Sequence, residues 1–343
     1  MNIVAFLLCC ALATNVYALP TDLQTFLRDQ VELSEKDLQK LKQEGVLTKL
    51  LDPDKKPEVA VFGIMHVDVA ADFFVDKYRD IETFMKSDRA VEVGTFTDPP
   101  GLSNLDALTL DSSDLQAIME CKVGDCNMKL PASVIERFRQ EIDWSEPDCQ
   151  KRATELIKQM LADYVRAYLI GGDAAMGQYD DQEYPLRLAD EFHELLQESR
   201  YLYEYVPELH EYLEFYPRIK LPNVENFIYW SEKKYDKLRP IVSINHITIF
   251  RRSQGKIKTL IASKQIYASH YFEASLELAA LVEEKDVADS SGFFLIYFNR
   301  SRIDTLRKSV PPGMKHTIRG EILNEVGQEM KLIKSRIEYL YRE

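Results

Sequence analysis

Two histidines on strand-like segments are the polar residues of this chain best placed to do chemistry. In Ile266–Leu278 the even-numbered positions are apolar except for His270, and the odd-numbered positions are polar or amphipathic. In Ile241–Phe250 the even-numbered positions carry His246 among apolar residues and one threonine. Because successive side chains of a strand point to opposite faces, this period of two predicts that both imidazoles face inward on nearby strands.

An inward-facing imidazole has four interpretations. It is a core residue bonded to a backbone carbonyl or a tyrosine hydroxyl, or it orients a ligand, acts as a general base, or binds a metal ion. In the metal interpretation His66 joins as a third ligand. The chain has no His-Glu-x-x-His, zinc-ribbon spacing, glycine-rich phosphate loop or nucleophile elbow. We therefore assign no catalytic residue, metal ion or cofactor, and take His246 and His270 as candidate ligand-binding residues.

The end of the last predicted strand supplies a second group of candidates. Arg300 and Arg302 place two guanidinium groups there, and Tyr297 lies on the same strand. Guanidinium groups bind carboxylate or phosphate headgroups through paired hydrogen bonds. The alternative is an ion pair with acidic side chains, which are abundant: 56 acidic residues stand against 43 basic ones. All three residues are candidate ligand-binding residues.

Three cysteines remain downstream of the N-terminal segment. Cys121 and Cys126 flank a glycine-containing turn, which in an oxidising compartment predicts a short-loop disulfide. Two free thiols, or a redox or metal pair, are the alternatives. A redox pair usually has two intervening residues, and zinc requires a second ligand pair. Cys149 is left over, and we interpret it as a buried small residue.

The first eighteen residues have the pattern of a secretory signal peptide. They carry no charged side chain, and the small-residue pattern that ends at Ala18 predicts cleavage between Ala18 and Leu19. The apolar run Ile3–Ala13 is roughly 11 residues long, whereas a membrane-spanning helix needs about 20. We expect export to the periplasm or the extracellular space and no transmembrane segment. Acylation of Cys9 or Cys10 is the alternative.

Composition and charge limit the classes of function. The formal net charge of −13 argues against sequence-independent nucleic-acid binding, which requires a basic face. A hydrophobic content of 45% excludes a disordered chain. Neither property indicates an oligomeric state.

The hydrophobic patterns predict a signal peptide (1–18), a helical lead-in with a polar linker (19–57) and one composite α+β domain (58–343). Strand-rich parts at 58–130 and 239–343 flank a mostly helical insertion at 131–238 that holds most of the 18 tyrosines. Strands are predicted at 58–67, 90–97, 105–110, 114–120, 126–130, 239–252, 256–268, 269–283 and 292–302. Helix Met314–Tyr341 closes the chain with an apolar stripe stepping by three and four residues. The tyrosines are interpreted either as packing residues or as the mouth of an apolar ligand site.

This order of elements over Glu58–Leu130 and Arg239–Tyr341 resembles the helix-grip fold of START-type lipid-transfer domains, the birch-pollen-allergen family and polyketide cyclases. The resemblance implies a curved antiparallel sheet around the last helix, with an apolar cavity between them; the helical insertion departs from it. The stretches Glu58–Gly63, Cys121–Cys126 and Ser269–Ser275 also resemble exported bacterial proteins of unassigned function.

These patterns favour an exported protein that binds a hydrophobic or amphipathic small molecule, such as a lipid, beneath the C-terminal helix. One alternative is a cyclase- or hydrolase-like enzyme that uses the same cavity, with His246 or His270 as base. The other is an interaction scaffold that uses the tyrosine-rich insertion.

Overall fold

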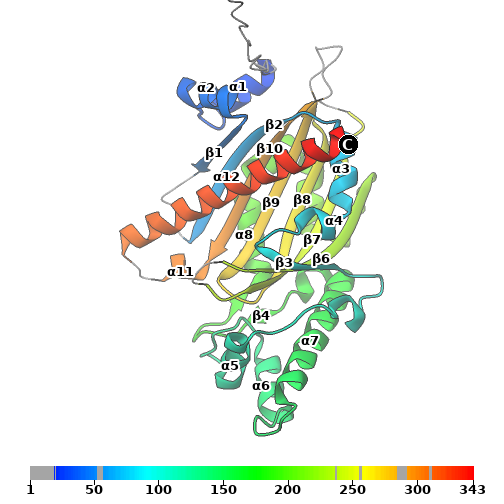
Figure 1. The fold of residues 1–343 in the computed structure, drawn as a ribbon, viewed down its shortest axis with the longest axis vertical. Coiled ribbons are helices and arrows are strands. Elements are labelled where there is room, and N and C mark those ends of the chain that lie inside the picture. The colour runs from blue at the N-terminus through cyan, green and yellow to red at the C-terminus, as the bar shows by residue number, and fades with distance from the viewer. Residues whose placement is uncertain are drawn as a thin grey trace, which may run out of the picture.

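The computed structural model describes residue 19 and residues 21–51, 57–235, 238–254, 257–283, 292–308 and 311–343. The predicted α+β class is confirmed: one large antiparallel sheet packs against helices, and a long helix, α12 (Pro312–Arg342), ends the chain (Figure 1). The predicted signal peptide lies outside the described residues. Within the described residues, no helix is long and apolar enough to cross a membrane.

The main sheet has eight strands, and every neighbouring pair is antiparallel. Their spatial order is β1 (Val46–Leu51), β2 (Glu58–Val67), β10 (Phe293–Ile303), β9 (Phe272–Glu283), β8 (Ile257–Ala268), β7 (Ile241–Arg251), β6 (Val224–Lys233) and β3 (Ala90–Thr95). The predicted strands at 58–67, 90–97, 239–252, 256–268, 269–283 and 292–302 are therefore confirmed, with ends shifted by up to three residues. Strands β1 and β6 were not predicted.

Two helices, α1 (Thr21–Asp29) and α2 (Glu35–Glu44), lie on the lead-in segment. Helix α2 begins with a capping box, in which the side chains of Ser34 and Asp37 bond each other's backbone, and it ends at Gly45 with φ 70°. The other helices and the two short strands outside the main sheet are α3 (Ala71–Arg79), α4 (Ile81–Met85), η1 (Leu102–Leu105), α5 (Ser112–Glu120), α6 (Ala132–Glu141), α7 (Cys149–Gly171), η2 (Gly172–Ala175), β4 (Gln178–Tyr179), β5 (Leu186–Arg187), α8 (Leu188–Glu198), α9 (Arg200–Tyr205), α10 (Pro207–Phe215) and α11 (Asp304–Arg307).

The short strands predicted at 105–110, 114–120 and 126–130 are wrong. The middle one is helix α5, because the Asp111 carboxylate caps it by accepting a 2.8 Å hydrogen bond from the backbone of Asp114. Leu115 and Ile118, three residues apart, then bury the same side of the helix. Helical structure therefore begins before the predicted insertion, whereas β6 is a strand within the predicted helical range.

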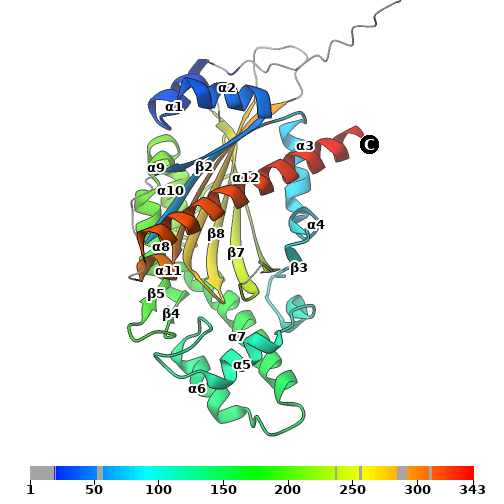
Figure 2. The same ribbon diagram turned by 60° about the vertical axis from the view of Figure 1, so that its left-hand side comes forward.

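The sheet has two differently covered faces. On the α12 face, odd-numbered residues such as Leu281 and Leu295 pack with Met330 of α12 and with α3 and α4. On the insertion face, even-numbered residues such as Ile244 pack with the helices between β3 and β6. Helix α12 runs diagonally across the sheet toward α3 and makes most of its contacts with β1 and β2, while α5, α6 and α7 gather beyond one end of the sheet (Figures 1 and 2).

A glycine in β2 allows α12 to approach the sheet. A Cβ at Gly63 would lie 2.5 Å from the Met330 sulfur and 3.0 Å from its methyl carbon. We expect Gly63→Ala to lower the free energy of unfolding by about 1–3 kcal/mol through overpacking, measured by urea denaturation.

Gly320→Ala is the matched control on α12, because a Cβ there meets nothing within 4 Å. Alanine is a better helix former than glycine, so this substitution should raise the free energy of unfolding by about 0.5–1 kcal/mol. Equal effects of the two substitutions would contradict close packing at Gly63.

Candidate functional site

The structure divides the predicted ligand-binding residues between different places. Tyr297 lies on the α12 face of β10, whereas Arg300 and Arg302 lie on its insertion face, as His246 does on β7. His270 lies in the turn between β8 and β9. These residues therefore do not line one common cavity.

The interpretation of His270 as an inward-facing strand residue is wrong. The chain reverses at residues 269–271, where Tyr271 adopts φ 60°, so the alternation before and after His270 belongs to two different strands. Its Nε2 atom lies 2.9 Å from the Asp114 Oδ1 atom, and the two residues are only 3% and 2% exposed. His270 thus ties the hairpin turn to α5.

His246 is buried and uses both ring nitrogens. Its Nδ1 atom lies 2.9 Å from the Tyr168 hydroxyl, and Nε2 lies 2.9 Å from the Asn226 Oδ1 atom. Because that amide oxygen only accepts, Nε2 donates to it and Nδ1 accepts from the hydroxyl. Burial, with the nearby Lys264 ammonium, lowers the His246 pKa to about 3. His246 is therefore a neutral core histidine bonded to a tyrosine, one of the four interpretations.

Lys264 is the buried ionisable residue that the sequence reasoning missed. It is the cross-strand neighbour of His246, is 1% exposed and pairs with the Asp173 carboxylate. Its Nζ atom lies 3.6 Å from the centre of the Phe192 ring. Burial lowers the Lys264 pKa to about 8 and raises the Asp173 pKa. The signal was available: position 264 continues the apolar even-numbered positions of its strand.

The two arginines of β10 are engaged in ion pairs. Arg300 pairs with the Glu58 carboxylate, and Arg302 lies 2.7 Å from Glu191 and 2.6 Å from Glu194. The ion-pair alternative is therefore confirmed, although both arginines are buried rather than on the surface. They join β10 to β2 and to α8.

His66 lies on the insertion face of β2, with its ring edge against Phe294. Burial lowers its pKa to about 4, despite the nearby Asp68 carboxylate. Three strands, β10, β9 and β8, lie between β2 and β7, so His66 and His246 do not meet. In the described parts of the chain, no group of three or more His, Cys, Asp or Glu residues is arranged to hold a metal ion.

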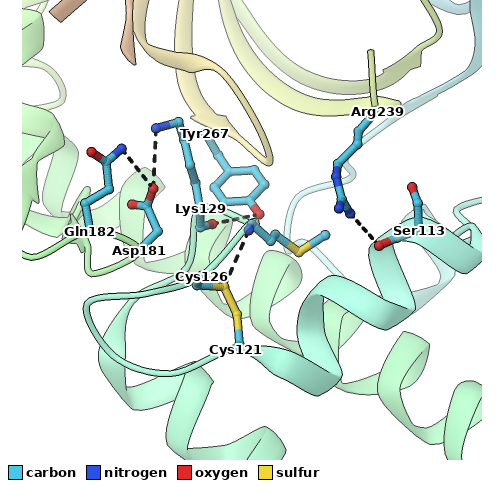
Figure 3. Close-up of a disulfide and its surroundings, with 9 residues drawn as sticks. Ser113, Cys121, Cys126, Lys129, Asp181, Gln182, Arg239 and Tyr267 are labelled. Atoms are coloured by element: carbon cyan, nitrogen blue, oxygen red, sulfur yellow. Dashed lines mark hydrogen bonds and ion pairs between the residues drawn. A yellow bond between two sulfur atoms is a disulfide. The ribbon is translucent and has the colours of Figure 1, made fainter. Parts of the chain in front are cut away.

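Cys121 and Cys126 form the predicted pair at the end of α5, with Cα atoms 4.5 Å apart (Figure 3). The loop between them docks on the segment before β5, because Gly124 and Cys126 donate backbone hydrogen bonds to the carbonyls of Asp180 and Asp181. Lys129, just beyond, lies 3.8 Å from the Asp181 carboxylate (Figure 3). Cys149 is a free, half-buried thiol.

A pocket of about 260 Å³ lies between α6, α7, the η2–β4 segment and the end of β8. Its lining is mainly aromatic, aliphatic and thioether: Pro131, Ser133, Val134, Arg137, Met160, Asp163, Tyr164, Ala175, Met176, Gly177, Gln178, Tyr179 and Tyr267. The pocket therefore sits among the clustered tyrosines of the insertion, where the sequence suggested an apolar ligand site as one interpretation.

The three tyrosine hydroxyls of this pocket bond to backbone groups. The Tyr164 hydroxyl lies 2.5 Å from the Ile266 carbonyl oxygen and 3.1 Å from that of Met176, and Tyr267 donates to the Lys129 carbonyl at 3.3 Å. The Tyr179 hydroxyl accepts from the Ala268 amide at 2.9 Å. With their hydroxyls engaged in this way, the tyrosines offer the pocket mainly their ring surfaces.

Charged groups lie at the pocket's polar side. Arg137 bonds to Glu141 at 2.7 Å, and Asp163 bonds to Arg166 at 2.6 Å. Both pairs are within one helix and largely exposed, so they are weak and exchange partners readily. The site thus combines an apolar interior with a polar, adaptable rim.

No protein-family model, curated protein or solved structure matches this chain. The assignment of function therefore depends on the geometry described above.

Proposed function

We propose that this chain is an exported binding protein for a small amphipathic molecule, whose apolar part enters the pocket between α6, α7 and Tyr267. The observation that carries the proposal is the pocket itself: aromatic and thioether walls with the tyrosine hydroxyls engaged elsewhere. Ligand sites are commonly concave and mostly apolar, with a few polar groups that fix orientation. The Cys121–Cys126 pair is compatible with an oxidising compartment and so with export.

The size of the pocket limits the ligand. Its volume of about 260 Å³ lies just below the roughly 300–1,000 Å³ typical of sites for drug-sized molecules. A ring system or a short chain fits this volume, with its polar end toward Ser133, Arg137 and Gln178. We put the ligand here rather than beneath α12, because the Met330 side chain of α12 packs directly over Gly63 of β2.

Filling the pocket tests this proposal. Ala175 lines it, so Ala175→Phe should occupy the space and weaken binding of the neutral apolar probe N-phenyl-1-naphthylamine at least about tenfold, equivalent to about 1.4 kcal/mol. Binding is measured by fluorescence titration. Ala174→Phe, at the exposed neighbouring position outside the lining, is the matched control and should bind like the unmodified protein.

Unchanged probe binding by a folded Ala175→Phe protein would overturn the proposal. Native mass spectrometry of protein purified from its own source adds an independent readout. We expect a co-purifying small molecule that is absent from the Ala175→Phe protein.

The enzymatic alternative receives less support. His246 uses both ring nitrogens within the core, His270 faces a buried carboxylate, and neither lines the pocket. The scaffold alternative depends on exposed aromatic side chains of the insertion. Tyr203 and Tyr205 are 41% and 42% exposed, but Tyr212 is buried, so these helices do not present one continuous aromatic patch.

A further inference from the structure

The α12 face of the sheet changes character along its strands. Toward the end of the sheet near α3, this face carries Ile249, Ile261 and Leu281, which pack in the apolar cluster with α12. Further along the same strands, the same face carries small polar side chains in two adjacent cross-strand rows. This polar floor consists of Asn245, Gln265, Ser275 and Ser301 in one row, and Ser263, Glu277 and Asn299 in the next.

The burial of the polar floor fits neither a packed core nor an open surface. Asn245 and Asn299 are each only 8% exposed and Ser301 only 3%, whereas polar residues on a solvated sheet face are normally well exposed. Gln265 and Glu277, in the middle strands, are half-buried, so solvent reaches them. Helix α12 makes most of its contacts with β1 and β2, on one side of the floor strands, and its Glu329 reaches Lys233 of β6 on their other side. These side chains therefore form a largely buried polar layer that solvent reaches at Gln265 and Glu277.

The floor retains hydrogen-bonding capacity. Ser275 and Ser301 share a 2.9 Å hydrogen bond, and Ser301 donates to the Asn299 amide oxygen at 2.9 Å. The Asn299 amide nitrogen makes two long contacts, to the Glu277 carboxylate and to the Tyr297 hydroxyl, each at 3.4 Å. The Asn245 amide nitrogen donates to the Ser243 hydroxyl at 3.2 Å. A primary amide has two donors and two acceptor lone pairs, and the Gln265 side chain bonds to no residue that the structure describes.

The charges beside the floor limit what binds there. Lys233 lies 3.8 Å from Glu329 of α12, and the Glu277 carboxylate faces the same region. Two carboxylates against one ammonium disfavour an anion, and Lys233 disfavours a second cation near Glu277. The floor otherwise offers donors and acceptors in mixed order. A hydroxyl group is both donor and acceptor, so it is the ligand group that matches this mixture.

We infer that the polar floor is a second binding site, which takes a neutral polyhydroxylated small molecule such as a free sugar or a polyol. Its hydroxyl groups bond to the amides of Gln265 and Asn299 and to the floor serines, and the Tyr297 ring borders the site. The site is on the opposite face of the sheet from the apolar pocket and is independent of it.

The test is saturation-transfer NMR of the purified protein with glucose, galactose and sorbitol. We expect at least one of them to bind, and Gln265→Leu to weaken that binding about tenfold, as expected for the loss of one or two hydrogen bonds. Because Gln265 bonds to no described residue, this variant should keep the stability of the parent protein. Gln150→Leu, at an exposed position on α7, is the matched control and should bind normally.

Two further measurements separate the outcomes. Ala175→Phe should leave sugar binding unchanged, so the failure of one site is distinguishable from the failure of the other. Glu277→Gln should weaken it less than Gln265→Leu, since the substituted amide still accepts a hydrogen bond. The absence of any saturation-transfer signal at millimolar concentrations, equal signals from Gln265→Leu and the parent protein, or displacement of the sugar by tetramethylammonium would each overturn the inference.

Discussion

Asp173→Asn should lower the free energy of unfolding by about 3 kcal/mol at pH 7, measured by urea denaturation. The substitution removes the only carboxylate that pairs with Lys264 among the described residues and leaves its ammonium buried at 1% exposure. Breaking a buried ion pair by removing one partner typically costs about 3–5 kcal/mol, because the remaining charge is desolvated without compensation. The Phe192 ring, 3.6 Å from Nζ, offsets only part of that cost.

Lys264→Met is the matched control and should lower the free energy of unfolding by about 1 kcal/mol or less. Methionine fills a similar volume, and the Asp173 side chain, at 20% exposure, still reaches water when its partner is gone. The asymmetry between the two variants is the prediction. Equal losses would mean that packing, rather than an uncompensated charge, determines the effect.

The pH dependence gives a second readout of the same prediction. Burial lowers the pKa of Lys264 to about 8, below its ordinary value of 10.5, so between these two pH values the unfolded chain binds more protons than the folded protein. Stability from this group therefore rises as pH increases from about 8 to 10.5. In Asp173→Asn the lysine loses its counter-charge and its pKa falls further. The difference in free energy of unfolding between the parent protein and the variant should accordingly shrink when the pH is raised from 7 to 10.

The sequence predicted most of the sheet because its strands carry strong local signals. Alternating or continuous apolar runs ended by turn residues located β2, β7, β8 and β10 within a few residues. It missed β6, whose first four residues, Val224–Phe227, are exposed or half-buried and include the polar Glu225 and Asn226. It also read α5 as a strand, because the capping role of Asp111 was not recognised. Both errors arise where pairing or capping, rather than hydrophobic period, decides the structure.

The candidate sites were less predictable, because they depend on tertiary contacts. The pocket combines segments around residues 131–137, 160–164 and 175–179 with Tyr267, and no local pattern joins them. The period of two placed His246 on the correct face but did not show that Tyr168 and Asn226 use both of its nitrogens. For His270 the same pattern failed, since it continues unbroken across a chain reversal.

Gly172→Ala should destabilise the protein by at least about 3 kcal/mol, the typical scale for a strained backbone combined with a clash. A Cβ at this position would lie 1.8 Å from the carbonyl oxygen of Tyr216, a backbone atom that cannot move aside as a flexible side chain can. Gly172 also has φ 58°, where side chains other than hydrogen are strained. Gly177→Ala isolates the second cause: its φ is 68°, but nothing lies within 4 Å of the added carbon. The free energy of unfolding of that control should fall by only about 1 kcal/mol in the same urea denaturation.

The close approach at Gly172 links the two largest expected effects. Tyr216, which an added Cβ would displace, has its ring centre 4.5 Å from that of His246, and the next residue after Gly172 is Asp173. A shift of this backbone should therefore disturb the Lys264–Asp173 pair as well as the packing over His246. Residues that act through one network show non-additive effects. The double variant Gly172→Ala/Asp173→Asn should thus lose less stability than the sum of the two single variants, whereas strict additivity would mean that glycine and ion pair act separately.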